Sequence, residues 1–129
     1  MELALGSRLL ATTPERASLV LAAALNAGEL EAAAACFARD ACLITPNATA
    51  IHGREEIRLL LAQMIARSSQ IEVALSTVLH AGEVALARQR WTIRSQGAEG
   101  DCYTQELNPT LVLRRLEANW KLAIAMPWG

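Results

Sequence analysis

The sequence predicts an α+β fold, in which three N-terminal helices pack on a strongly curved, mainly antiparallel sheet. Three observations carry this prediction. Apolar residues recur at helical spacing through the first half of the chain, and from Gln70 onward apolar and polar residues alternate. Two of the later strands would be about fourteen to sixteen residues long, and strands of that length stay in one sheet only if the sheet bends. A bent sheet wrapped around helices forms a cone, and we expect this cone to enclose a cavity that can hold a ligand.

The first two helices are expected to follow each other closely. Thr13 can cap the free amides at the start of the first helix, Pro14 suits its first turn, and Gly28 suits a left-handed exit. Between these residues the helix is apolar nearly all round, so we expect other elements to cover it on more than one side. A second, shorter helix is expected over residues 29–40, where several alanines allow close packing against the first.

A strand, a turn and a short strand are expected between the second helix and the third. The strand is the run "CLIT" at 42–45, and Pro46-Asn47 has the chemistry of a turn. The third helix should begin after Gly53 and end near Ser68. Its apolar residues repeat at i, i+3, i+4, i+7 and i+8, namely Ile57, Leu60, Leu61, Met64 and Ile65.

The rest of the chain is expected to form four antiparallel strands joined by tight turns. Pro109 lies in the third of these strands, and a proline cannot donate a ladder hydrogen bond. We therefore expect a bulge or a break in pairing at Asn108-Pro109, with a shift in side-chain alternation there. In the first of the four strands, one face should carry every second residue, namely Ile71, Val73, Leu75, Thr77 and Leu79.

Length and composition limit the classes of protein to which the chain can belong. A chain of 129 residues fits one domain spanning 1–129, in which residues 1–12 would form an N-terminal arm. Hydrophobic residues make up 53%, yet no apolar run could span a membrane, so the surplus points to a subunit interface or a cavity. The net charge of −1 argues against nucleic-acid binding. Three cysteines without a CxxC pair, and a start unlike a secretion signal, favour a cytoplasmic protein.

Common catalytic and cofactor motifs are absent from the sequence. It contains no GxGxxG, Walker or GxSxG motif. His52 and His80 lie far apart, and neither has a Cys or His partner at the spacing of metal ligands. We therefore expect neither a metal site nor a cofactor.

Three stretches resemble one family of small proteins. They are "LNAGELEAAAACFARDACLITP", "IHGREEI" and the closing "LVLRRLEANWKLAIAMPWG". Together they are similar to the nuclear transport factor 2-like superfamily, and most similar to its SnoaL-like branch, which is related to ketosteroid isomerase. The resemblance covers roughly residues 14–129 and implies a cystatin-like roll with a mostly apolar cavity, whose outer sheet face often pairs two subunits. This fold hosts isomerases, polyketide cyclases, epoxide hydrolases, dehydratases, binding proteins and association domains.

The chain departs from ketosteroid isomerase at the positions that carry its chemistry. That reaction needs a carboxylate to move a proton at carbon, and hydroxyl or protonated-acid donors to stabilise the dienolate. The resemblance places the base position on Thr45, the tyrosine donor position on Leu21 and the acid donor position near Thr110. Because none of the three residues fits its role, we expect that the protein is not a ketosteroid isomerase.

Few polar residues remain that could face the cavity. Glu106 is the candidate catalytic residue, because it is the one acid on the later strands that could point inward, where an apolar site would raise its pKa. Trp91 could form an aromatic wall or simply belong to the core. The ligand-binding candidates are Thr45, Gln89, Asn108 and Thr110, with Trp91 and Trp128 as walls.

Three functional interpretations follow. The first is a homodimer that binds a small, largely apolar organic molecule of unknown identity, with catalysis left open. The alternative is an acid–base enzyme of the isomerase, polyketide cyclase or epoxide hydrolase type, using Glu106 with Asn108 and Thr110. The third is an association domain with a vestigial cavity. An inward carboxylate would favour the enzyme, a cavity without titratable groups would favour binding, and a filled cavity would favour association.

Overall fold

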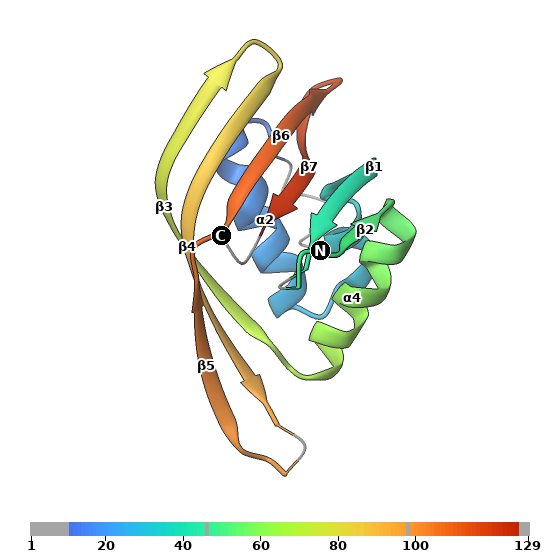
Figure 1. The fold of residues 1–129 in the computed structure, drawn as a ribbon, viewed down its shortest axis with the longest axis vertical. Helices are drawn as coiled ribbons and strands as arrows, with labels where there is room; N and C mark the ends of the chain where they lie inside the picture. The colour runs from blue at the N-terminus through green and yellow to red at the C-terminus, as the bar shows by residue number, and fades with distance from the viewer. Residues whose placement is uncertain (1–10, 46, 98, 127–129) are drawn as a thin grey trace, which may run out of the picture.

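The computed structural model describes residues 11–45, 47–97 and 99–126, and these residues form the α+β fold expected from the sequence (Figure 1). Most of the expected N-terminal arm lies outside this range. The helices are α2 (Pro14–Asn26), α3 (Leu30–Ala34) and α4 (Arg54–Ala66). The strands are β1 (Phe37–Ile44), β2 (Ala50–His52), β3 (Gln70–Ala81), β4 (Val84–Gln96), β5 (Cys102–Leu107), β6 (Thr110–Leu116) and β7 (Asn119–Met126).

The strands form one seven-stranded sheet in the order β2-β1-β7-β6-β4-β3, with β5 paired to β4. All pairs are antiparallel except β1 with β7, which is parallel. Figure 1 shows that the sheet curves strongly and that α2 and α4 lie on its concave side. The end of β4 and its partner β5 extend past the helices. The sheet and helices together make the expected cone.

The two N-terminal helices differ in part from their sequence patterns. Thr13 occupies the N-cap of α2 with an extended backbone, but its side chain makes no capping hydrogen bond, so the expected cap is wrong. Gly28 follows the helix with φ 73°, the left-handed exit that glycine accommodates. The second helix ends at Ala34 instead of reaching residue 40. Pairing with β7, in which Phe37 lies opposite Leu122, makes the following residues a strand despite their helical composition.

No helix among the described residues is both long and apolar enough to pass through a lipid bilayer.

A bulge in β3 reverses the side-chain alternation that the sequence predicts. Leu75 lies opposite Gln89 and Thr77 lies opposite Arg88, so one extra residue of β3 is accommodated between these pairs. Beyond the bulge, Leu79 is 61% exposed. The single alternating face expected from Ile71 to Leu79 is therefore wrong, because the extra residue moves the second half of the strand to the opposite face.

The chain breaks its pairing at Asn108-Pro109, as the proline predicts, but no extra residue is inserted there. Leu107 lies opposite Trp91 and Thr110 lies opposite Arg88, so both strands advance by the same number of residues. The expected shift in alternation is therefore wrong. Residues of even number remain on the outer face throughout β5 and β6.

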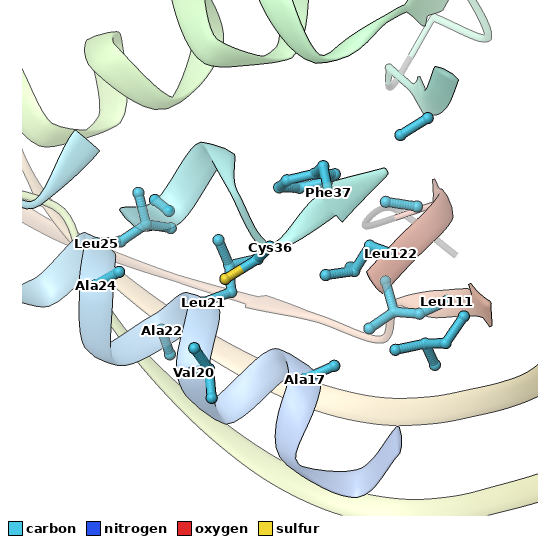
Figure 2. Packing of buried hydrophobic residues seen from close by; sticks show 14 of the residues in the cluster. Ala17, Val20, Leu21, Ala22, Ala24, Leu25, Cys36, Phe37, Leu111 and Leu122 are labelled. Carbon is cyan, nitrogen blue, oxygen red and sulfur yellow. The ribbon is translucent and has the colours of Figure 1, made fainter. Parts of the chain in front are cut away.

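The core lies between α2 and the concave face of the sheet. Ala17, Ala24 and Leu25 of α2 are almost fully buried, and the alanines let the helix approach the strands closely. Figure 2 shows Leu21 and Leu25 of α2 on the side that faces β1, and Val20 and Ala22 on the opposite side of the helix. Leu111 and Leu122 from β6 and β7 close the other side of this core.

Asn26 ties the end of α2 to the start of β3. Its Nδ2 donates to the carbonyl of Ile71 at 2.9 Å, and the amide of Ile71 donates to its Oδ1 at 2.8 Å. The side chain of Asn26 thus satisfies both the backbone N–H and the backbone C=O of Ile71. This clamp sets the helix against the strand that borders the cavity.

We predict that Asn26→Ala lowers the free energy of unfolding by about 2 kcal/mol, because two hydrogen bonds to the backbone of Ile71 are lost. Urea denaturation followed by circular dichroism measures the change. Gln63→Ala is the control, since Gln63 is an exposed amide on α4. Equal stabilities for the two variants would contradict the proposed clamp.

Candidate functional site

A cavity of about 170 Å³ lies between the concave face of the sheet, α2 and α4. Its walls are mainly aliphatic and aromatic. Leu21 comes from α2, Phe37 from β1, Leu61 from α4, and Trp91 and Leu107 from the facing strands. Figure 2 shows Leu21 pointing from α2 toward β1. The cavity therefore forms where the helices stand away from the sheet.

The polarity of the cavity changes along the strands. Trp91 lies opposite Leu107 in an apolar row, and Ile93 lies opposite Gln105 in a mixed row. The next row toward the end of β4 is polar: Ser95 lies opposite Tyr103, and the hydroxyl of Ser69 lies 2.9 Å from that of Ser95. All of these residues line the cavity. An apolar interior thus leads to a row of three hydroxyl groups, which we call the hydroxyl row (Ser69, Ser95 and Tyr103).

The hydroxyl row lies next to the mouth of the cavity. Ser69 and Ser95 are buried, whereas Tyr103 is 45% exposed. Arg67, at the end of α4, also lines the cavity and is exposed. Arg67 and Tyr103 line a second, outer hollow together with Gln96 and Gly97, so the two spaces share a border. A ligand entering from this side would pass a cation and a phenol before reaching the apolar interior.

A buried hydrogen-bond relay holds Trp91 in the cavity wall. The indole Nε1 of Trp91 donates to Oε1 of Gln89 at 2.7 Å, and Nε2 of Gln89 donates to Oγ of Ser18 at 2.7 Å. All three residues are at most 6% exposed. Gln89 does not line the cavity itself. Its position indicates that it orients the tryptophan, whereas the sequence suggested that it would contact a ligand.

Three of the predicted site residues lie on the outer face of the sheet. Glu106 and Asn108 are exposed, Thr110 is partly exposed, and none of them lines the cavity. The register explains this placement, because Glu106 lies opposite Thr92 while its neighbour Leu107 lies opposite the inward Trp91. The inward orientation on which the catalytic hypothesis for Glu106 depends is therefore wrong.

Thr45 belongs to a turn, and it does not line the cavity. Its Oγ1 lies 2.5 Å from Oδ1 of Asn47, and it accepts the amide hydrogen of Thr49 at 3.1 Å. These contacts indicate that Thr45 stabilises the turn. Trp128 lies outside the described residues. Of the predicted ligand-binding residues, Trp91 is the one that the structure places in the cavity wall.

The residues lining the cavity within the described ranges include no carboxylate and no imidazole. The carboxyl groups with lowered pKa values do not line the cavity: hydrogen bonds from Arg58 and Arg114 lower the pKa of Glu31 and of Asp40, respectively, and a backbone hydrogen bond lowers the pKa of Glu15. Burial raises the pKa of the Cys36 thiol to about 11, but Cys36 does not line the cavity. Across the described part of the chain, no three His, Cys, Asp or Glu side chains gather as metal ligands.

The sequence reasoning missed the hydroxyl row and Arg67. Ser95 and Trp91 both have odd numbers in β4, so their side chains lie on the same face of the sheet. The prediction that Trp91 faces the cavity therefore implies that Ser95 faces it too. Ser69 and Tyr103 could not be found in this way, because their positions depend on how β3 and β5 pair with β4.

Comparison with known proteins gives the family and the fold. Residues 20–115 match the model of the SnoaL-like domain family. No curated protein sequence matches the chain. A ketosteroid isomerase-like protein from Erwinia carotovora atroseptica SCRI1043 is 18% identical, with a TM-score of 0.75 over 87% of this chain and 89% of that chain.

Two further solved structures share the architecture. A candidate dehydratase of the nuclear transport factor 2-like family from Streptomyces avermitilis is 21% identical, with a TM-score of 0.72 over 85% of this chain and 88% of that one. A candidate calcium/calmodulin-dependent protein kinase II association domain from Xanthomonas campestris is 19% identical, with a TM-score of 0.72 over 87% and 83% of the two chains. At these identities the likeness establishes the fold alone.

We predict that Gln89→Leu destabilises the protein by about 2–4 kcal/mol, because it leaves the Trp91 indole N–H and the Ser18 hydroxyl buried without their partner. Urea denaturation monitored by tryptophan fluorescence gives the value. Gln63→Leu is the matched control at an exposed position outside the cavity lining and should change stability by less than about 0.5 kcal/mol. A Gln89→Leu variant as stable as this control would show that the relay contributes nothing.

Proposed function

This chain belongs to the SnoaL-like domain family, and from that premise we propose that it binds a small, largely apolar organic molecule in the cavity beneath the sheet. The observation that carries the proposal is an apolar cavity of about 170 Å³ whose described lining holds no carboxylate or imidazole. An engineered apolar cavity of about 150 Å³ in another protein holds benzene. The expected ligand therefore has roughly the size of one aromatic ring with short substituents.

An unfilled cavity lowers the stability of a fold, and this cost supports a ligand-binding role for the domain over a purely structural one. Unfilled volume in a core costs roughly 24 cal/mol per Å³, so a cavity of this size would cost on the order of 4 kcal/mol. Filling it would need only larger side chains at positions such as Ala125, which lines it. A domain used only for association would gain stability from such a change.

The enzyme alternative has less support. An isomerase or dehydratase that moves protons at carbon needs a general base within hydrogen-bond reach of its substrate. Glu106 is exposed on the opposite face of the sheet, and Thr45 is engaged in its turn. The isomerase-like and dehydratase neighbours share only their fold with this chain, so they do not support an activity for it. Ligand binding without proton abstraction fits the cavity better.

The outer face of the sheet supports a homodimer as the working form. Leu79 lies opposite Leu86, Leu86 opposite Val112, and Val112 opposite Ile124, so one apolar row crosses four strands. Leu79 is 61% exposed and Ile124 is 40% exposed. A second copy of the chain, presenting the same row around a two-fold axis, would cover it. The similarity to an association domain accords with this proposal.

We predict that toluene raises the melting temperature by about 5 °C at ten times its dissociation constant, because a ligand that binds only the folded state stabilises it by about 1.4 kcal/mol. Differential scanning fluorimetry measures the shift. Ala125→Leu, which fills the cavity, should abolish the shift, and Ala50→Leu at an exposed position should retain it. No shift in the unmodified protein at saturating toluene would refute the binding proposal and favour association.

We predict that the protein is a dimer at micromolar concentration and that Leu86→Glu converts it to a monomer, because a charge would be buried in the apolar row. Sedimentation velocity separates the two states. Leu59→Glu is the control, since Leu59 is 62% exposed on α4, away from the outer face. The proposed interface would be refuted if the unmodified protein were a monomer, or if the Leu86→Glu variant were still a dimer.

A further inference from the structure

We propose that the ligand carries a single carboxylate, which Arg67 and the hydroxyl row bind at the mouth while its apolar body fills the interior. This inference rests on the proposed binding function and adds the chemical class of the ligand. It depends on the polar end of the cavity, where one cation, three hydroxyl groups and, one row further in, the amide of Gln105 meet an otherwise apolar lining.

The guanidinium group of Arg67 is available to a ligand. Within the described residues its side chain makes no hydrogen bond or ion pair, whereas Arg58, Arg94 and Arg114 each contact a carboxylate. Among the described residues that line the cavity, Arg67 is also the one that carries a charge. A guanidinium presents parallel N–H donors that match the two oxygens of a carboxylate. One cation balances one negative charge, which favours a monoanion over a phosphate dianion.

The serine pair supplies a second donor deeper inside. Ser69 and Ser95 share one hydrogen bond of 2.9 Å, and neither hydroxyl makes another within the described structure. Two hydroxyl groups carry two hydrogens, so one of them is not used in this bond. Both serines are buried, at 5% and 9% exposure, where an unused donor is unfavourable unless an acceptor arrives. A carboxylate oxygen at this point would provide that acceptor.

The order of the groups sets the orientation of the ligand. Arg67 and Tyr103 border both the cavity and the outer hollow, and Ser95 lies opposite Tyr103. From there the lining becomes apolar, through Ile93 to Trp91. An aromatic or short aliphatic acid would therefore lie with its ring or chain against Trp91 and its carboxylate between the serine pair and Arg67.

Binding of phenylacetate, phenylacetamide and toluene to the full chain, measured by calorimetry and by thermal shift, tests this inference. Phenylacetamide has nearly the shape of phenylacetate but no charge, and toluene lacks both oxygens. We expect phenylacetate to bind about five- to tenfold more tightly than phenylacetamide, a modest preference because Arg67 is exposed to solvent. Toluene should bind more weakly than either compound.

Three variants separate the contributions. Arg67→Gln should remove the preference for phenylacetate over phenylacetamide, and Arg39→Gln, at an exposed arginine of β1, should retain the preference. Ser95→Ala should weaken the binding of phenylacetate and phenylacetamide several-fold more than it weakens the binding of toluene. If phenylacetate and phenylacetamide bind equally, or if Arg67→Gln keeps the preference, the carboxylate assignment fails while the binding function stands. If none of the three compounds binds, both fail.

Discussion

The uninterrupted alternation of side chains along β4 is the constraint on which the rest of the structure depends. Its thirteen residues place every odd-numbered side chain on the concave face and every even-numbered one outside. The inward residues change in character along the strand. Ala85 and Ala87 are small and fully buried, Trp91 forms part of the cavity wall, and Ser95 brings a hydroxyl to the mouth. One strand thus determines where the core ends, where the cavity lies and where its polar end begins.

The same alternation places Leu86 in the apolar row of the outer face. Leu79 belongs to this row because the bulge in β3 moves the second half of that strand to the opposite face. If β3 paired with β4 without the bulge between Leu75 and Thr77, Leu79 would turn inward and Val78 would lie opposite Leu86. A bulge also increases the local bend and twist of a strand. The bulge therefore bends β3 at the same point where it moves Leu79 into the outer row.

Much of the fold could be predicted from local patterns, because its long helices and strands obey them. The stripe from Ile57 to Ile65 predicted α4, and Pro109 predicted the break between β5 and β6. The errors arose where a distant partner decides the structure. Residues after Ala34 have helical composition but pair with β7, and the inward or outward orientation of Glu106 depends on the register of β5 against β4. For the site, parity could indicate Trp91 and Ser95, but no local signal could bring Ser69 beside Ser95.

The functional groups at the mouth of the cavity limit the reactions that the cavity can support. A guanidinium and neutral hydroxyl groups donate hydrogen bonds, so they can hold a carboxylate or polarise a carbonyl. Abstraction of a proton from carbon needs a basic group with a pKa near the working pH, and neither an arginine nor a serine outside a catalytic pair supplies one. The described lining offers donors at one end and hydrocarbon at the other. Such an arrangement suits the binding of the small acid that we propose as ligand, and turnover would require a base that the ligand or a partner brings to the mouth.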